Sequence, residues 1–440
     1  MIEVIALLVL VAVFAISAIR GVHMGALALV AALLVGVLVV GEPLDDVLGG
    51  FPVDALLILL GITYLFGIAR TVGAVDWLVD RSVRLIGDRV ALIPWAMLLV
   101  GTLVACLGTS HAAFTIVPIA MSLAHKHRIH STMMGIFMSS AIVGGALAPT
   151  SIVGITVMTV ASTADIAYDP ALMFGLSIGI NLLVSSVAFL MFGGRELIAR
   201  GRAAKAAAAE DAPLGSGGRT AVATATRTET EAPVRLSGYG LLTLIAIPVL
   251  IVGFATVTML EIDLNLGAVA LTLAVLLALV DPKVGKRALG MIDWNTILLL
   301  GGIITYVGVL TRLGAIDQLG EVARSVSVPL IAAFVMCVIA ALVSAFASTI
   351  GIIGALIPLA VPLLVPGGGL EMTGFIYALA ISASLVDCAP FGTTGATIVA
   401  SGHEDDRPRL YRHLATWGLS MVVIGPVVTL LLLVVPFLGR

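Results

Sequence analysis

The stretch GITYLFGIARTVGAVDWL, residues 61–78, returns as GIITYVGVLTRLGAIDQL, residues 302–319, with one residue slipped. Three further segments repeat in the same order at offsets near 240–242 residues: 25–39 as 267–281, 108–120 as 348–360, and 139–154 as 382–395, the last with two residues fewer in the second copy. Unrelated Leu- and Ala-rich helices would resemble one another in composition, but they would not carry the same Thr-Tyr, Gly-Ala and Pro residues in the same order. We conclude that the chain contains two copies of one unit.

The composition places most of the chain in lipid. Of its 440 residues, 60% are hydrophobic and 11% are charged, whereas a soluble domain carries about 25% charged residues. So few charges cannot cover a surface that faces water. The formal net charge of −3 and the lack of a basic face give no indication of nucleic-acid binding. Cys106, Cys337 and Cys388 lie far apart in apolar segments and predict neither a disulfide framework nor a metal knuckle.

Apolar runs of about 17–25 residues predict membrane-spanning helices. They lie near 2–19, 24–41, 53–70, 133–160, 171–193, 237–258, 264–281, 292–311, 373–400 and 414–437. Two further apolar regions, 89–125 and 328–365, each carry a polar break in the middle, and we expect each to form a re-entrant hairpin. The residues after the first break, 112–124, are too few to cross a hydrocarbon core of about 30 Å as a helix.

Loop charges predict the sidedness. We expect the basic loops to lie inside the cell and the acidic loops outside; the former are 70–89, 125–130, 281–287 and 405–413, and the latter are 41–46, 162–170 and 261–263. Arg312 and Arg324 would then lie outside, beside Asp317 and Glu321. The three histidines of the 125–130 loop are expected to cap a helix at the cytoplasmic face, and no bound metal is expected.

The predicted fold class is an all-α polytopic membrane protein with an inverted repeat. Each half holds five transmembrane helices plus one re-entrant hairpin, with discontinuous helices. The first repeat covers 1–193 with hairpin 89–125, and the second covers 237–440 with hairpin 328–365. Because five is odd, the second half must be inverted relative to the first, which is the plan of secondary transporters. Residues 194–236, rich in Ala, Gly, Thr, Arg and Pro, are expected to form a flexible cytoplasmic linker.

Four polar breaks, paired by the repeat, are expected to converge near the midplane of the bilayer: 108–111, 144–151, 348–351 and 387–395. Helix ends inside lipid leave backbone groups unpaired unless they line a cavity or bind a ligand. Half-helix N-termini carry partial positive charge and suit an anion, whereas carbonyls and Asp387 suit a cation. The predicted substrate-binding residues are Thr109, Ser110, His111, Pro149, Thr150, Ser151, Ser348, Thr349, Pro390, Gly392, Thr393 and Thr394. The predicted ion-coupling residues are Asp387, His111, Gly144 and Gly145.

Each of these candidates has a structural alternative. A Ser or Thr in a membrane helix can simply bond the carbonyl of the preceding turn, and Gly144 and Gly145 can simply permit close helix packing. A carboxylate in lipid is costly and usually functional, so Asp387 is the strongest candidate. A protonated His111 would add a full positive charge beside an anionic substrate.

The chain resembles the MatC-type dicarboxylate (malonate) carriers. The resemblance lies in residues 23–79, which begin HMGALALVAALLVG, and in SASLVDCAPFGTTGATIVA at 382–400, and it extends over nearly the whole chain apart from the linker. The wider group is the ion transporter superfamily, which includes divalent anion/sodium symporters. The resemblance implies a homodimer in which a scaffold carries a moving transport unit that works as an elevator.

The family pattern has Ser-Asn-Thr at each hairpin tip, and this sequence departs from it. The first tip reads Thr109-Ser110-His111 and the second reads Ser348-Thr349, so the asparagine is missing from both. The departure puts the familiar sodium coordination in question and leaves proton coupling through His111 or Asp387 open.

The sequence therefore predicts a secondary active transporter of the bacterial inner membrane. It would take up small C3/C4 dicarboxylates such as malonate or succinate by alternating access, coupled to sodium or protons. The expected partners are the dicarboxylate, the lipid bilayer and a second copy of the chain, with no cofactor besides the coupling cation. An alternative is a sodium/proton or other cation antiporter on the same scaffold, with Asp387 and His111 as the exchanging pair. A polytopic enzyme would need a nucleophile–base pair or a metal triad at one depth, and we predict no catalytic residue.

Overall fold

Every element in the described part of the chain is helical. The computed structural model describes residues 2–75, 77, 81, 90–106, 112–164, 166–200, 236–259, 264–315, 329–346, 349–364 and 372–435. The first half contains α1 (Ile2–Arg20), α2 (Met24–Leu33), the π-helix η1 (Leu34–Val40), α3 (Leu44–Gly49), α4 (Val53–Thr71), η2 (Val90–Leu92), α6 (Ile93–Cys106), α7 (Ala112–Lys126), α8 (Ser131–Ala146), α9 (Ile152–Thr163) and α10 (Pro170–Met191). The second half contains α12 (Gly238–Met259), α13 (Leu266–Val280), α14 (Pro282–Leu289), α15 (Trp294–Arg312), α17 (Pro329–Phe346), α18 (Thr349–Leu364), α19 (Met372–Leu385), η3 (Val386–Cys388), α20 (Thr393–Ser401), η4 (Glu404–Asp406) and α21 (Arg407–Leu433).

The surface of this helical assembly is apolar over long stretches. Among the described residues, five candidate helices are long and apolar enough to cross a membrane: Val53–Thr71, Pro170–Met191, Trp294–Arg312, Met372–Ser401 and Glu404–Leu433. Large apolar side chains face outward, among them Leu8 (62% exposed), Val11 (63%) and Leu279 (71%). Exposing such surface to water costs about 25 cal/mol per Å². Lipid is therefore the solvent of these faces, and the chain is a multi-pass membrane protein.

Two of the predicted spans, 133–160 and 373–400, are each divided into two helices. In the first, α8 ends at Ala146 and α9 begins at Ile152. In the second, α19 passes into the single turn η3, and α20 begins at Thr393. The interruptions fall where the prolines predict them, because proline removes a ladder donor and clashes with the preceding turn. Of the predicted linker, residues 194–200 are helical, and the remainder up to residue 235 lies outside the described residues.

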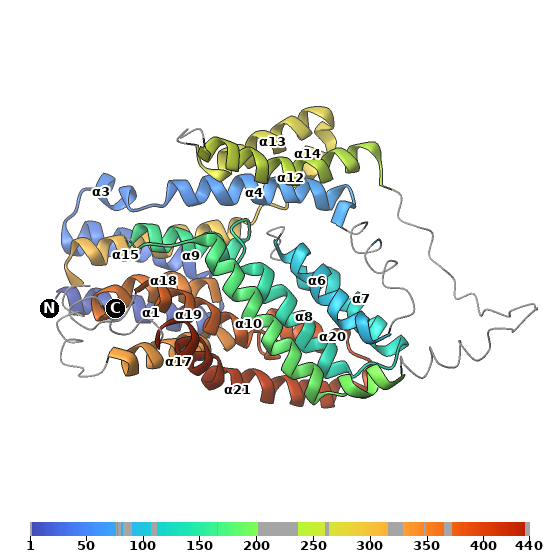
Figure 1. The fold of residues 1–440 in the computed structure, drawn as a ribbon. Coiled ribbons are helices and arrows are strands. Elements are labelled where there is room, and N and C mark those ends of the chain that lie inside the picture. Colours follow the sequence, from blue (N-terminus) through green and yellow to red (C-terminus); the bar gives the residue numbers. More distant parts are fainter. Residues whose placement is uncertain are drawn as a thin grey trace, which may run out of the picture.

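The two halves of the chain cross each other at pairs of glycines. Helix α2 packs against α15, and α4 packs against α13. In Figure 1, α4 runs directly below the group formed by α12, α13 and α14. A Cβ at Gly302 would overlap the backbone of Gly25, and a Cβ at Gly61 would overlap the backbone of Gly267. Gly25 corresponds to Gly267 in the repeat, and Gly61 corresponds to Gly302. One contact is thus made twice, and it brings the backbones closer than any side chain would allow.

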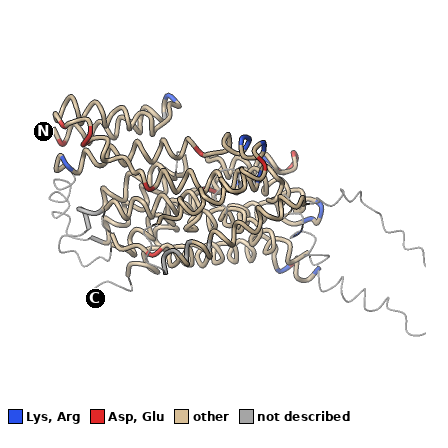
Figure 2. Tube along the Cα trace, turned by 90° about the horizontal axis from the view of Figure 1, so that it is seen from above, with Lys and Arg blue, Asp and Glu red and all other residues tan. Residues whose placement is uncertain are grey.

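Helix ends that the loop charges assign to one side of the membrane lie together. On the predicted outer side, the Asp169 N–H donates to Tyr377 Oη at 2.9 Å, and Thr373 donates to the carbonyl of Ala167 at 3.0 Å. On the predicted inner side, Ser131 Oγ donates to Asp406 at 3.1 Å. Figure 2 shows that most of the Lys and Arg residues gather at one end of the helices.

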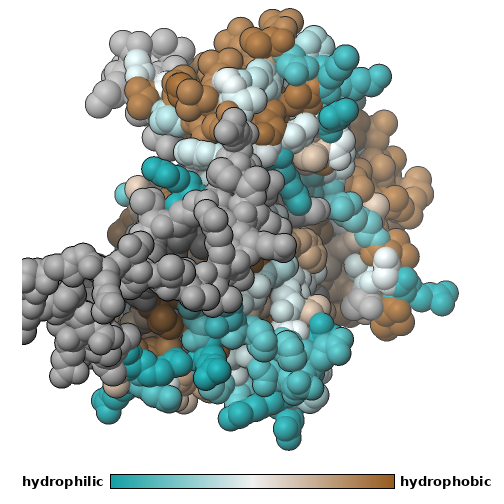
Figure 3. Space-filling model, turned by 90° about the vertical axis from the view of Figure 1, so that its right-hand side faces the viewer, coloured by the Kyte–Doolittle hydropathy of each residue, from teal (hydrophilic) through white to brown (hydrophobic). Residues whose placement is uncertain are grey.

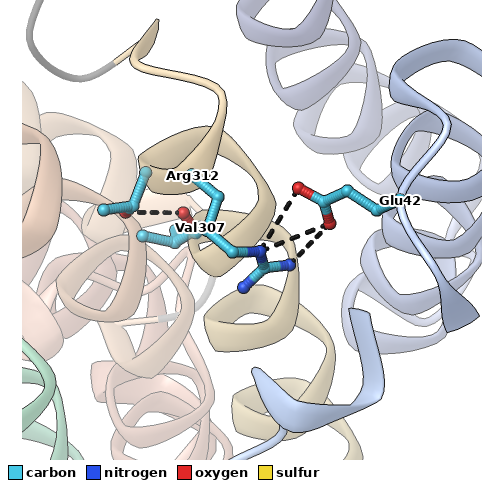
Figure 4. A network of polar contacts seen from close by, with 4 residues as sticks. Glu42, Val307 and Arg312 are labelled. Carbon is cyan, nitrogen blue, oxygen red and sulfur yellow. Dashed lines mark hydrogen bonds and ion pairs between the residues drawn. The ribbon is translucent and has the colours of Figure 1, made fainter. Parts of the chain in front are cut away.

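Within the described residues, Arg312 pairs with an acid from the other half of the chain. Its guanidinium donates to Glu42 in the loop after η1, with Nη2 2.9 Å from Oε2 and Nε 3.3 Å from both carboxylate oxygens (Figure 4). Asp317 and Glu321, its expected neighbours, lie outside the described residues, as does Arg324. The fold brings the loop that follows η1 in the first half to the end of α15. Both residues thus lie at the same end of the molecule, as the sidedness prediction requires.

The glycine crossings generate a stability prediction. We expect Gly302→Val to lower the thermal stability of the detergent-solubilised protein by at least the ~1–3 kcal/mol typical of overpacking, because its new side chain meets backbone that cannot rotate away. The measurement is size-exclusion chromatography after heating. Gly179→Val in α10 is the matched control, since a Cβ there meets no atom within 4 Å. Equal melting of the two variants would contradict the crossing.

Candidate functional site

The first break, between α8 and α9, is closed largely by its own hydroxyl groups. Ser151 accepts a hydrogen bond from the Gly154 N–H at 3.4 Å as the N-cap of α9. Its Oγ donates to the carbonyls of Ala146 and Ala148. Thr150 Oγ1 donates to the carbonyl of Cys106, the last residue of α6, at 2.6 Å. The first hairpin is therefore tied directly to the first break.

The second break, between α19 and α20, repeats this backbone geometry with different chemistry. A Cβ at Gly395 would overlap the carbonyl oxygen of Ala389, just as one at Gly154 would overlap that of Ala148. Gly154 and Gly395 are separated by the repeat offset of 241 residues, and so are Ala148 and Ala389. Gly392 occupies the N-cap position of α20 and provides no side-chain hydrogen bond. The N–H groups and partial positive charge of this helix end are thus not neutralised by a capping side chain.

A carboxylate connects the second break to the second hairpin. Asp387, in η3, is the one charged residue in the sequence 372–401 and is partly buried. Thr349 Oγ1, at the start of α18, donates to Asp387 Oδ1 at 3.0 Å. Ser344 Oγ on α17 lies 2.6 Å from the same Thr349 hydroxyl. Both arms of the hairpin therefore contribute a hydroxyl to a short chain that ends on the acid.

The two hairpins and the two breaks also interlock across the halves. Helix α7 of the first hairpin packs against α20, and α18 of the second hairpin packs against α9. In addition, η3 packs against α8. An acid with a hydroxyl partner and an uncapped helix N-terminus thus lie in one break, with the other break beside it. This arrangement offers oxygen ligands to a cation and N–H donors to an anion.

The structure brings several predicted residues into these breaks, and others lie outside its described part. Thr109, Ser110, His111 and Ser348 are outside the described residues. Pro149, Thr150 and Ser151 form the first break, and Pro390, Gly392, Thr393 and Thr394 form the second. Thr393 is exposed and Thr394 is buried. The substrate and ion roles of these residues stay predictions.

Gly145 occupies a tightly packed position, whereas the surroundings of Gly144 leave room for a Cβ at ordinary van der Waals distance. A Cβ at Gly145 would overlap the carbonyl oxygen of Thr102 in α6, and one at Gly144 would lie 3.6 Å from Asn181 Cβ in α10. The contact at Gly145 fits the helix-packing alternative that the sequence left open, and the one at Gly144 does not require a glycine. The ion-coupling prediction for the two glycines has no further support in these contacts.

Two polar residues near the breaks were not singled out from the sequence. Ser344 joins the Thr349–Asp387 chain, and Asn181 is buried (3% exposed) beside Gly144, with no hydrogen-bond partner for its Oδ1 among the described residues. A lone Asn within an apolar span such as 171–193 was a usable signal, because amides are costly in lipid. No comparable signal distinguished Ser344 from the other hydroxyl residues of the spans.

The helical fold, the apolar surface and the two interrupted helices define a multi-pass membrane protein. Residues 1–148 match the family model of the dicarboxylate carrier protein MatC N-terminus. The solved structure of the YdaH transporter from Alcanivorax borkumensis is similar in fold, with a TM-score of 0.56, 13% sequence identity, and coverage of 92% of this chain and 95% of that chain. No curated protein sequence matches the chain significantly. Both matches are to transporters rather than enzymes.

The Thr349 hydroxyl provides a test of this site. We expect Thr349→Val, which keeps the side-chain shape, to lower stability by about 1.5–3 kcal/mol, because Asp387 loses a hydrogen bond to a charged group. Thr349→Ser should restore most of the loss. Differential scanning fluorimetry of the purified protein measures both. Thr397→Val is the control, since that hydroxyl bonds only its own helix, at 2.7 Å. If the Thr349→Val protein is as stable as the Thr397→Val protein, the hydrogen bond from Thr349 to Asp387 does not stabilise the site.

Proposed function

We propose that the protein is a secondary active transporter that takes up C3 or C4 dicarboxylates, such as malonate or succinate, together with a cation. The observation that carries the proposal is the contact between Thr349 and Asp387 beside the uncapped N-terminus of α20. The match of residues 1–148 to a dicarboxylate carrier family supports the substrate class. The bacterial inner membrane, sodium or proton as the cation, and assembly as a homodimer are part of the proposal.

Charge explains why an anion and a cation would bind together. The N–H groups at the start of α20 attract one carboxylate of the substrate. Asp387 attracts the coupling ion, whose charge offsets part of the substrate's double negative charge. Without that ion, inward transport of each negative charge would oppose the membrane potential by about 2.3 kcal/mol per 100 mV.

Packing supports alternating access between two groups of helices. Helices α2, α4, α13 and α15 form one group through the glycine crossings, whereas the hairpins and broken helices pack mainly on one another. The groups meet where α18 packs against α15 and α9 packs against α4. No comparable packing joins the repeat-related pairs, α7 with α4 and α20 with α15, among the described residues.

This asymmetry fits an inward-facing state of an inverted repeat. By the predicted sidedness, α9 and α18 lead to the outer side, and α7 and α20 lead to the inner side. The outer contacts are made here and their inner equivalents are not, so the site would be closed to the outside. The outward-facing state would exchange the two sets of contacts, as expected for a transport unit that moves as an elevator against a scaffold.

An antiporter on the same scaffold is the second candidate. It rests on the same acid, because a partly buried carboxylate can exchange a proton for a metal cation. It differs from the first candidate in requiring no organic substrate.

Uptake by Asp387→Asn proteoliposomes tests the coupling role. The neutral amide cannot attract a cation as strongly, so we expect accumulation of labelled malonate or succinate under a sodium or proton gradient to fall at least tenfold, with the protein still inserted. Asp405→Asn is the control, since that side chain is 93% exposed and should leave uptake unchanged. Wild-type uptake by Asp387→Asn would refute the role of the acid. If the wild-type protein takes up no dicarboxylate under either gradient, the antiporter is favoured.

Cross-linking tests the exchange of contacts. In this structure a Cβ at Gly354 would lie 3.7 Å from Ile303 Cγ2, and the repeat-related positions are Phe114 and Ile62. In a background without native cysteines, we expect Gly354→Cys with Ile303→Cys to cross-link in the state described, and Phe114→Cys with Ile62→Cys in the opposite state. Saturating cation and substrate should shift the ratio of the two yields. If both cross-linking yields change in the same direction, or if Phe114→Cys and Ile62→Cys never cross-link, the proposed exchange of contacts between the two repeats is contradicted.

A further inference from the structure

A polar pocket and an apolar groove adjoin at one end of α10 and α21. The pocket has a volume of about 590 Å³ and lies among residues 128–132, the end of α10 and the start of α21. The groove, of about 460 Å³, runs between α10 and α21 and is lined almost entirely by apolar side chains such as Leu183 and Ile424. Met191, Phe192 and His413 line both. The two spaces therefore form one site with a polar end and an apolar end.

The polar end carries more positive than negative charge. Arg128, Arg200 and Arg409 line it together with Glu196 and Asp406, and the acid of Asp406 already accepts a hydrogen bond from Ser131. Arg200 donates to the backbone carbonyl of Arg128 at 3.0 Å, which places the two guanidinium-bearing residues side by side. Arg409 is exposed and forms no ion pair within the described part of the chain.

Two histidines complete this polar end. The rings of His130 and His413 are stacked, with centroids 6.1 Å apart, and His413 Nδ1 lies 2.9 Å from Thr132 Oγ1. Burial lowers the pKa of His130, electrostatic interactions with Arg409 and His413 lower it further, and Asp406 opposes them. Apart from Asp406, the groups that act on the imidazole therefore make its surroundings unfavourable for another cation.

Aromatic rings mark the boundary between the two ends. Phe192 lies 5.3 Å from His130, 6.0 Å from His413 and 6.0 Å from Trp417, centroid to centroid. Trp417 lines the apolar groove. Aromatic side chains at such a polar–apolar transition are typical of the membrane interface. Figure 3 views this end of the molecule, and hydrophilic side chains gather along its lower edge.

We propose that this site binds an anionic phospholipid, with the phosphate among Arg128, Arg200 and Arg409 and an acyl chain along the groove between α10 and α21. Basic pockets between membrane helices on the cytoplasmic side suit such headgroups, because each Arg contributes about 1 kcal/mol of attraction. A soluble anion would use only the polar end and leave the groove to other apolar occupants. The continuity of the two ends therefore favours the lipid.

Lipid binding to the purified, detergent-solubilised protein tests the headgroup end. We expect native mass spectrometry to show tighter retention of phosphatidylglycerol than of phosphatidylcholine. Arg409→Ala should weaken phosphatidylglycerol binding about fivefold, the equivalent of one such attraction. Arg412→Ala is the matched control, since Arg412 is exposed on the same helix and does not line the pocket. Equal binding of the two lipids, or equal effects of the two substitutions, would overturn the proposal.

A second variant and a second ligand test the acyl end. Val187→Trp fills the groove, in which Val187 is 42% exposed, and should weaken phosphatidylglycerol binding while the headgroup residues stay intact. Inorganic phosphate alone should raise the melting midpoint less than phosphatidylglycerol does. If phosphate stabilises as well as the lipid and Val187→Trp has no effect, the site takes a soluble anion and the proposal fails. These readouts measure binding, so they do not depend on the transported substrate.

Discussion

The close approach of two pairs of glycines is the constraint on which this fold depends. Gly25 on Gly302 and Gly61 on Gly267 allow four helices from two halves of the chain to cross without side chains between them. Lipid offers no hydrophobic drive for helix association, so packing at such contacts must supply the stabilisation. Threonine hydroxyl groups in these helices also form hydrogen bonds within their own helix. Thr63 and Thr305 each donate to a carbonyl of their own helix at 2.6 Å.

The two breaks share one backbone form but differ in the polar groups that they present. Interrupted helices are tolerated in a membrane only where their free backbone groups find partners. In the first break, the hydroxyls of Thr150 and Ser151 supply those partners locally. In the second, the matching positions hold Phe391 and Gly392, which have no hydroxyl, and the nearby polar contact runs from Thr349 to Asp387. The repeat thus preserves the backbone geometry, while the carboxylate and its hydroxyl partner occur in the second copy.

The sequence predicts the structural features that local prolines and glycines determine. It misses the features that depend on contacts between residues far apart in the chain. Prolines and glycines locate both broken helices, because their effects on the helix ladder are local. Apolar runs and loop charges predict the membrane character and which helix ends meet. The partner of Arg312 could not be predicted, because Glu42 lies 270 residues away and approaches through the fold. The link from Ser344 to Thr349 depends on side-chain orientation at a hairpin tip, which hydrophobic pattern does not encode. From the sequence alone, Gly145 is equally compatible with a binding role and a packing role. Its close approach to α6 in the structure favours packing.

Helices α10 and α21 lie between the two breaks and the surface of the protein that carries the apolar groove. They are repeat-related, and each supports one broken helix: α10 packs on α8, and α21 packs on α19 and η3. A Cβ at Gly418 of α21 would lie 2.6 Å from Ala389 Cβ in the second break, while the adjacent Trp417 lines the groove beside α10. One helix therefore contacts both the backbone next to Asp387 and the apolar groove. Packed interiors have low compressibility and transmit strain, and α21 is the packed element that lies between the groove and the second break.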